Sequence, residues 1–347
     1  MVAPLTLILS GCSAKDVERN LRFGWPTGVT KQATEMRVFW TWAGVVALAV
    51  GVLVWGLIFW CCIRYRKKSD ELPRQTKYNL PLEIAYSIFP FLIIAGLFWR
   101  TVVVENNVNA LTKNPDVVIQ VDAFKWNWQF EYHTVLDSSG HAVVEQYPGV
   151  TNALAASSKQ SDERLGFANR QTCDEASSNA SYSCGATGGT NDNTPLYLST
   201  VGSSDEIPIL VIPVNKSIRV VEHSEDVIHS FWVPEFLFKR DVIPYGTTST
   251  SRDNQFEFTP TSVGSYVGRC AELCGTYHSQ MNFEVRVVPD DVFTAYLAAL
   301  SKIGPDDPSR QSKALAIAMP GQSPYATTTH PFNTDRTKGG AATTSGS

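Results

Sequence analysis

The longest apolar stretch of the chain predicts a membrane-spanning helix. It runs from Val38 to Ile63 without a charged side chain, and lies between Arg37 and Arg64. A helix needs about 20 apolar residues to cross the hydrocarbon core of a bilayer, and this stretch is longer. Tryptophans near both ends of the stretch are typical of the membrane–water interface. We therefore expect a membrane span here rather than a helix buried in a protein core.

A second apolar run predicts a second span. Ile84–Trp99 is shorter, but the flanking stretches Tyr78–Leu82 and Thr101–Val104 extend it to spanning length. Together the two runs predict a transmembrane helical hairpin over residues 37–105. Glu83 lies at the mouth of the second span, where an ionisable side chain is costly and often marks a functional path. A carboxylate that only extends to the interface is the alternative.

After the hairpin the pattern changes to period two, which predicts β-strands. Large aromatic side chains occupy every second position at Phe124, Trp126, Trp128, Phe130 and Tyr132. Further short apolar runs follow between residues 209 and 288, separated by turn-forming residues. Closely spaced strands of this kind predict a sandwich or a barrel, so residues 106–303 are interpreted as one all-β exterior domain that ends in a helix.

Two stretches of different composition interrupt and follow this domain. Residues of about 138–205 are rich in Ser, Ala, Asn, Gly and Thr and predict a long insertion rather than core. Within it, Cys173 and Cys184 have ten residues between them and are candidates for a disulfide on an oxidising side of the membrane. The C-terminal extension, residues 304–347, is expected to follow a partner surface or to stay mobile.

Charge predicts the orientation of the chain in the membrane. The loop over residues 64–77 contains six basic and two acidic side chains, which is typical of a cytoplasmic loop. This would place the N-terminus and the exterior domain on the outer face of a bacterial cell membrane. The whole chain has a net charge of −4, so the part outside this +4 loop carries −8. An acidic exterior suits a basic partner, although it also serves solubility, and it argues against a nucleic-acid binder.

The N-terminal segment, residues 1–36, contains a candidate lipidation site. Residues 9–12, Leu-Ser-Gly-Cys, are similar to the box that precedes the lipid-modified cysteine of bacterial lipoproteins. A secretory signal has a basic start, whereas no Lys or Arg precedes Cys12. Lipidation of Cys12 and a chance match therefore stay as alternatives.

Four metal-binding side chains lie within twelve residues near the end of the exterior domain. They form the pattern C-x3-C-x3-H-x2-M with Cys270, Cys274, His278 and Met281. Two thiolates, an imidazole and a thioether favour copper, because thioether ligands suit copper and structural zinc is held by Cys and His. One more nitrogen ligand is expected upstream of Cys270. His229 is the stronger candidate and His223 the weaker.

The second cysteine predicts two metal ions rather than one. A mononuclear electron-transfer copper uses one Cys, two His and a weak axial Met. Two thiolates can each bridge two metals, so each copper would take one imidazole and one weak ligand, Met281 on one and a main-chain oxygen on the other. One electron shared over two metals changes each bond little, which favours fast transfer. A Cys270–Cys274 disulfide or a zinc knuckle is the alternative, and neither accounts for Met281 or His229.

At this point the chain resembles a known family, subunit II of the haem–copper cytochrome c oxidases. The resemblance covers roughly residues 37–303 without the insertion. Its motifs are LEIAYSIFP before the second span, FKWNWQFEY, EDVIHSFWVPEF, KRDVIPYG and CAELCGTYHSQM. It implies a two-helix transmembrane hairpin followed by an all-β cupredoxin-like Greek-key sandwich that carries a binuclear copper centre, CuA.

The resemblance also implies roles for individual residues. It implies copper ligands at the side chains of His229, Cys270, Cys274, His278 and Met281 and at the main-chain oxygen of Glu272. The Glu272 side chain would bind a magnesium ion shared with subunit I. Trp126 matches the aromatic residue through which electrons arrive, and Glu83 matches the carboxylate at the mouth of a proton path into subunit I.

The function implied is that of the electron-accepting subunit of a respiratory terminal oxidase. Cytochrome c would reduce CuA, and CuA would reduce haem in subunit I, where oxygen becomes water. Subunits I and III, a c-type cytochrome and membrane lipid are the expected partners. A quinol oxidase subunit II would lack the copper ligands. A membrane-tethered copper-binding or chaperone protein without an oxidase role, the other alternative, would not need Trp126 or Glu83.

Several departures from the general family resemble its actinobacterial branch. These are the insertion, the candidate lipid anchor and the long C-terminal extension. In that branch the oxidase is held in a supercomplex with a reductase whose tethered c-type cytochrome delivers electrons, so the insertion is expected to clamp the neighbouring complex. Asp226 is expected to help dock the donor or to cap a turn. Cys61 and Cys62 are interpreted as apolar residues at a membrane edge.

Overall fold

The chain forms two compact units, which are described separately. One unit contains the helical region Ala33–Val108, and the other contains Val29–Gln32 and the chain from Asn109 onward. The computed structural model describes residues 25–67, 70, 76–136, 142–145, 198–203, 205–244, 255–304 and 306–329.

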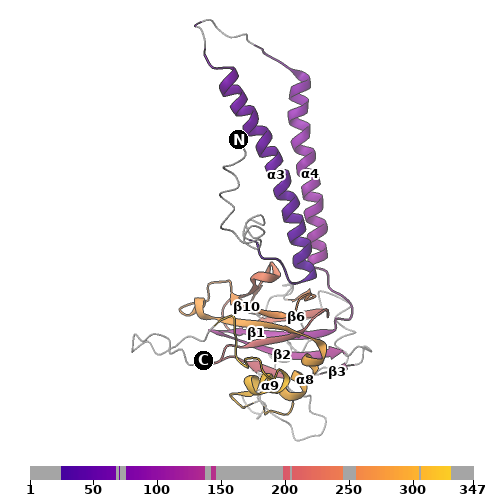
Figure 1. The fold of residues 1–347 in the computed structure, drawn as a ribbon, viewed down its shortest axis with the longest axis vertical. Helices are drawn as coiled ribbons and strands as arrows, with labels where there is room; N and C mark the ends of the chain where they lie inside the picture. The colour runs from indigo at the N-terminus through magenta and orange to yellow at the C-terminus, as the bar shows by residue number, and fades with distance from the viewer. Residues whose placement is uncertain are drawn as a thin grey trace, which may run out of the picture. The chain divides into compact units, whose positions relative to one another are not determined.

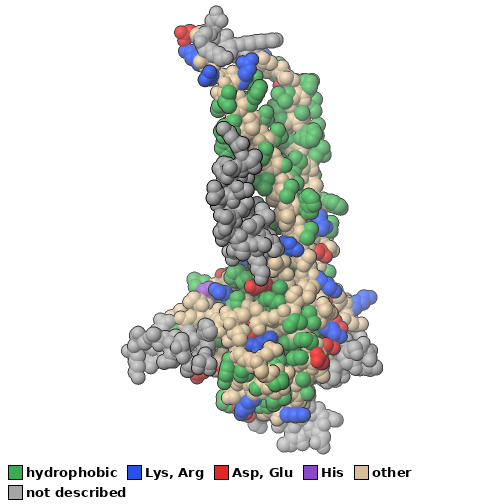
Figure 2. Space-filling view, in the orientation of Figure 1, with side chains coloured by type: hydrophobic (Ala, Val, Ile, Leu, Met, Phe, Trp, Pro, Cys, Tyr) green, Lys and Arg blue, Asp and Glu red, His purple; other side chains and the backbone are tan. Residues whose placement is uncertain are grey.

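The first unit consists of two long apolar helices, α3 (Lys31–Arg64) and α4 (Leu80–Val108) (Figure 1). Almost none of the most apolar stretch of either helix is buried in the protein. Hydrophobic side chains cover the visible sides of both helices (Figure 2). A helix that is apolar all round and not buried in protein suits a lipid environment. By length and composition, both predicted spans are thus present as helices that could cross a membrane.

The ends of the hairpin differ in their polar contacts. Asn107 Nδ2 donates a hydrogen bond of 3.1 Å to Glu35, which joins the end of α4 to the start of α3. At the opposite end, Lys and Arg side chains gather where α3 ends and α4 begins (Figure 2). These side chains belong to the loop from which the orientation in the membrane was predicted.

The second unit is a sandwich of two β-sheets, which confirms the predicted fold class. One sheet has the order β3-β2-β1-β6-β9, with β4 also paired to β2, and the other has the order β5-β11-β10-β7-β8. The strands are β1 (Val117–Phe124), β2 (Asn127–Leu136), β3 (Ala142–Glu145), β4 (Ser199–Val201), β5 (Ile209–Pro213), β6 (Ile218–Ser224), β7 (His229–Val233), β8 (Phe238–Val242), β9 (Gln255–Phe258), β10 (Gly264–Cys270) and β11 (Asn282–Val288). Two short 3-10 helices, η1 (Pro234–Phe236) and η2 (His278–Gln280), lie between strands.

Aromatic side chains fill the space between the sheets. Trp128, Phe130 and Tyr132 on β2 are 0% exposed, as their period-two spacing predicts. Trp128 and Phe130 meet Phe283 of the other sheet edge to face, with ring centroids 5.1 and 5.7 Å apart. Trp126 departs from the series because a turn at Lys125–Trp126 separates β1 from β2, so its side chain does not join this core row.

Both ends of the predicted insertion take part in the sheet. β3 and β4 pair antiparallel with β2, at Thr134↔Glu145 and Phe130↔Thr200 respectively. Strand pairing therefore extends into residues 138–205 from either side. Most of the stretch between β3 and β4 lies outside the described residues.

The C-terminal extension packs on its own domain over residues 310–328, in contrast to the expectation of a partner-bound or mobile segment. After α8 (Asp290–Leu300), a further helix, α9 (Arg310–Ala318), packs against α8. Farther along, the buried Glu284 carboxylate accepts hydrogen bonds from the amides of Thr327 (2.7 Å) and Thr328 (3.0 Å). Composition alone missed these contacts, because the partner of both threonines lies far back along the chain, on β11.

Candidate metal centre

The strands of one sheet bring the predicted ligand residues together. His229 is the first residue of β7 and Cys270 the last of β10, and these two strands pair with Cys270 opposite Phe231. The loop after Cys270 returns at Met281, whose carbonyl accepts the Cys270 amide at 3.1 Å. Sheet pairing thus fixes both ends of the loop that carries the other ligand candidates.

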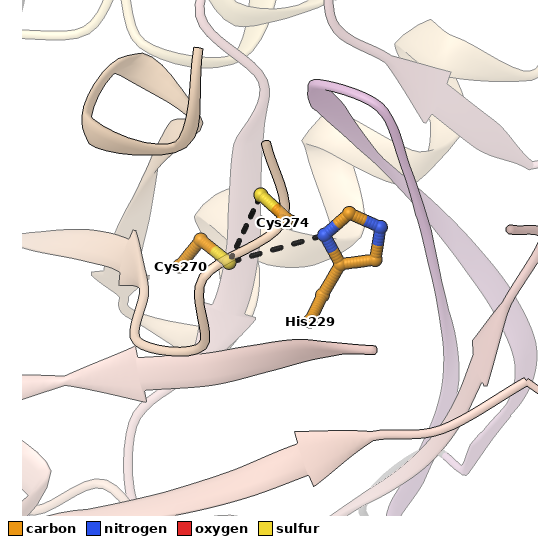
Figure 3. Close-up of side chains that lie close together, drawn as sticks. All are labelled: His229, Cys270 and Cys274. Atoms are coloured by element: carbon orange, nitrogen blue, oxygen red, sulfur yellow. Dashed lines mark hydrogen bonds between the residues drawn. The ribbon is translucent and has the colours of Figure 1, made fainter. Parts of the chain in front are cut away.

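The two cysteine sulfurs form the middle of the cluster. Cys270 Sγ lies 3.8 Å from Cys274 Sγ and 3.9 Å from His229 Nδ1 (Figure 3). On the other side, Cys274 Sγ lies 3.6 Å from His278 Nδ1 and 3.8 Å from Met281 Sδ. The cluster therefore has two poles, with one cysteine sulfur and one imidazole at each.

The main-chain oxygen of Glu272 completes the Cys270 pole, 3.2 Å from that sulfur. This is the arrangement predicted for two ions, with a thioether at one end and a carbonyl at the other. His223, the weaker candidate, is not part of the cluster, since its ring lies against Asp122 and Glu225 instead.

The donor set fits a pair of soft metal ions. Both cysteines are free, and their 3.8 Å separation is far longer than a disulfide bond of about 2.05 Å. A metal–thiolate bond is about 2.3 Å long, so two sulfurs bound to one ion can be up to about 4.6 Å apart. The two cysteine sulfurs are closer than this, so both can bind the same ion, and a second ion could bind them from the opposite side. Most of the cluster is buried, with His229, Cys274 and Met281 at most 4% exposed, whereas His278 is partly exposed.

A carboxylate orients the His229 ring. Asp226 Oδ1 accepts a hydrogen bond of 2.8 Å from His229 Nε2 and is itself held by the amides of Val227 (2.6 Å) and Lys125, the latter through Oδ2 at 2.9 Å. With the proton on Nε2, Nδ1 presents a lone pair toward Cys270, as in many metal-binding histidines. From the sequence, Asp226 was expected only to help dock the donor or to cap a turn. Its position three residues before a predicted ligand was the signal that could have suggested this support.

Burial shifts the acid–base behaviour of the cluster. Desolvation lowers the pKa of His229, although the Asp226 hydrogen bond opposes this shift. The pKa of Asp226 is itself lowered, because hydrogen bonds from His229 and two amides outweigh the raising effect of burial. Burial, with the adjacent Cys270 sulfur, raises the pKa of Cys274. These shifts favour a neutral His229 imidazole and a protonated Cys274 thiol. A bound metal cation would displace the thiol proton, and both side chains would then act as ligands.

Trp126 lies directly over the ligand loop. Its indole Nε1–H donates a hydrogen bond of 3.2 Å to the carbonyl of Cys274. Tyr277 meets the indole edge to face, with centroids 4.7 Å apart. Gly275, at φ +117°, leaves room for the ring, since a Cβ there would lie 3.3 Å from Trp126 Nε1. The contact with Tyr277 and the need for Gly275 were not predicted, because they depend on the fold of the loop.

The other predicted side chains are not among the contacts of the cluster described above. The Glu272 side chain is exposed. In the helical unit, Glu83 Oε1 accepts the amide of Asn79 at 2.9 Å, which caps the start of α4. Cys61 and Cys62 are exposed on α3. The predictions for Cys12, Cys173 and Cys184 fall outside the described residues.

Comparison with known proteins identifies the family. Residues 201–288 match the family model described as cytochrome c oxidase subunit II, periplasmic domain. The chain is 48% identical to a probable cytochrome c oxidase subunit 2 of Nocardia farcinica, over 97% of this chain and 87% of the relative. It is 41% identical to cytochrome c oxidase subunit 2 of Mycobacterium bovis, over 97% and 88%. The solved periplasmic domain of subunit II of cytochrome oxidase from Bradyrhizobium japonicum is 23% identical, covers 53% of this chain and 93% of its own, and gives a TM-score of 0.31. With high identity over nearly its whole length, the chain belongs to the cytochrome c oxidase subunit 2 family.

Proposed function

We propose that this chain accepts electrons from a c-type cytochrome at a binuclear copper centre and passes them to haem in subunit I, where oxygen is reduced to water. The observation that carries the proposal is the pair of unbonded sulfurs, 3.8 Å apart, with a separate imidazole beside each. A mononuclear copper site needs only one thiolate. When bound, a copper pair supplies the acceptance and release of one electron at a time.

The ligands that we propose are the side chains of His229, Cys270, Cys274, His278 and Met281 and the main-chain oxygen of Glu272. All of them lie in the two-pole cluster described above. Asp226 would act as a positioning residue, because its hydrogen bond keeps the proton on His229 Nε2 and leaves Nδ1 for the metal. Burial of the cluster would exclude water and keep the ligand set rigid.

Trp126 is the residue through which we propose that electrons arrive. Its indole is one hydrogen bond from the main chain of Cys274, a proposed ligand, and it is only partly buried. A Trp126→Phe variant should accept electrons from reduced cytochrome c at least tenfold more slowly in stopped-flow mixing, with an unchanged copper spectrum. Trp232→Phe, at a partly buried position on β7, is the matched control.

Two further roles are proposed from the family. Glu83 would lie at the mouth of a proton path into subunit I, and its cap on α4 would hold the carboxylate at the helix start. The exposed Glu272 carboxylate would bind a magnesium ion shared with subunit I. The predicted orientation, with the copper domain on the outer face, and association with subunits I and III belong to the same proposal.

Copper stoichiometry and magnetic resonance test the central claim. The purified full-length chain loaded with copper should contain two copper ions per chain and give a seven-line mixed-valence signal. His229→Ala should abolish that signal, whereas His223→Ala should preserve it. One copper ion per chain, or a four-line mononuclear signal, would refute the binuclear centre and favour a copper-binding protein of another kind.

A further inference from the structure

A second group of metal-binding side chains lies on the other sheet. Asp122 of β1, His223 of β6 and Glu225 just after β6 place ligand atoms within 4.8 Å of one another. β1 and β6 are parallel neighbours, with Asp122 directly opposite His223. The Glu225 amide donates to the carbonyl of Ala123 at 2.9 Å, which holds the residue after β6 against the end of β1. The backbone therefore fixes all three positions.

The two distances from the His223 ring nitrogen are close to those between neighbouring ligand atoms around one metal ion. His223 Nδ1 lies 3.3 Å from Asp122 Oδ1 and 3.4 Å from Glu225 Oε1. Charge-assisted hydrogen bonds from a ring nitrogen to a carboxylate are shorter, at about 2.7–2.9 Å. Ligand atoms about 2.0–2.2 Å from a tetrahedral zinc ion lie about 3.4 Å from each other. One nitrogen faces two carboxylates from separate side chains at nearly this spacing.

A neighbouring side chain outside the group holds one of the carboxylates in place. Gln120 Nε2 donates to both oxygens of Asp122, at 2.8 and 2.9 Å. Asp122 is 1% exposed and Gln120 6% exposed, so the carboxylate is buried and fixed in one orientation. Hydrogen bonds of this kind orient the ligands of metal sites. The Glu225 side chain is 45% exposed, which leaves a route from solvent to the group.

The charge of the group favours a cation. Burial alone lowers the pKa of His223, but hydrogen bonds and charges from Asp122 and Glu225 outweigh it and raise the pKa to about 9. The two carboxylates thus stabilise positive charge at the ring nitrogen. A divalent ion that displaces the ring proton would satisfy the same two carboxylates.

We propose that Asp122, His223 and Glu225 form a zinc site, with a fourth position open to water or to a ligand from a partner. The imidazole favours zinc over magnesium and calcium, which prefer oxygen ligands. This site shares no residue with the sulfur cluster. It would tie the end of β1 to the end of β6, close in the chain to Asp226 and to the turn that carries Trp126.

Zinc binding by the full-length protein loaded with only two copper ions per chain tests the proposal, because the thiolates of the sulfur cluster take up this copper and none is left for the second group. Calorimetric titration with Zn²⁺ should give one site per chain, and X-ray absorption should show nitrogen and oxygen ligands without sulfur. His223→Gln should weaken binding at least a hundredfold, and zinc should no longer raise the melting midpoint of this variant. Glu225→Gln, at an exposed position that tolerates change, should weaken binding at least tenfold.

A second histidine–carboxylate pair provides the matched control. His133 and Glu131 both lie on the neighbouring strand β2, and the His133 ring nitrogen is 3.5 Å from a Glu131 carboxylate oxygen. Among the described residues, this pair does not form a group of three possible metal ligands. His133→Gln should leave zinc affinity within threefold of the parent protein. Absence of stoichiometric zinc binding, sulfur in the zinc shell, or equal affinity in the parent and in folded Glu225→Gln would each overturn the proposal.

Discussion

Replacing Glu284 by Gln should release the end of the C-terminal extension from the exterior domain. Glu284 is 0% exposed, and one carboxylate oxygen faces the Arg286 guanidinium while the other faces Thr327 and Thr328. Every one of these partners donates. A glutamine must turn its NH2 group toward either the guanidinium or the two threonines, so one side becomes donor against donor.

The expected loss is about 3 kcal/mol, since breaking a buried ion pair costs about 3–5 kcal/mol and the amide oxygen of Gln still accepts on one side. This corresponds to about a hundredfold faster hydrogen exchange of the Thr327 and Thr328 amides, if exchange follows local opening of the segment. Mass spectrometry of peptides covering residues 320–329 in the detergent-solubilised full chain measures this directly. Asp306→Asn, the analogous change at an exposed site, should alter stability by less than about 0.5 kcal/mol.

Acid should have the same effect on the parent protein. Burial alone would raise the pKa of Glu284. The Arg286 guanidinium and the amides of Thr327 and Thr328 outweigh burial, so the pKa of Glu284 is lowered. A lowered folded pKa stabilises the protein above the ordinary carboxyl pKa of about 4.3, and this contribution is lost as pH falls through the lower folded value. Glu284→Gln should lack this pH dependence. Unchanged protection of the two amides in the variant, or equal loss of protection throughout the domain, would refute the reasoning.

Two further variants probe the metal centre. Asp226→Asn should weaken copper retention about 10–100-fold, because the neutral amide holds the His229 tautomer less strongly. Competition with a copper chelator measures this, with the exposed Asp241→Asn as control, and equal retention in both variants would contradict the positioning role. Gly275→Ala should cost about 1–2 kcal/mol of stability, since φ of +117° strains an L-residue and the new Cβ presses on Trp126. A lowered melting midpoint and a shifted tryptophan emission are expected, and parent-like values of both would exclude the strain.

The sequence predicted the parts of the structure that follow local periodicity or spacing. The strands over residues 209–288 and the two apolar helices could be predicted because short apolar runs between turn-forming residues indicate strands, and because lipid demands continuous apolar side chains. The C-x3-C-x3-H-x2-M spacing predicted the ligand loop, and the structure places His229 rather than His223 beside it.

Other features depend on contacts between distant segments and could not be predicted. Glu284 and Arg286 lie on β11, inside their sheet, whereas their partners Thr327 and Ser323 come well after α8 in the chain. The turn at Lys125–Trp126 was missed because aromatic alternation continues across it. The contact of Trp126 with the Cys274 carbonyl arises only when this turn meets the ligand loop.

The closed base of the ligand loop has a consequence for how such centres diversify. The chain leaves the sheet at Cys270 and rejoins it at Met281, and the hydrogen bond between these two residues holds the ends together whatever lies between them. The loop over residues 271–280 could then change in length or sequence while its two ends stay paired. Of the proposed ligands, only His229 lies outside the stretch from Cys270 to Met281, so changes confined to one short segment of the gene could alter the metal content of the centre.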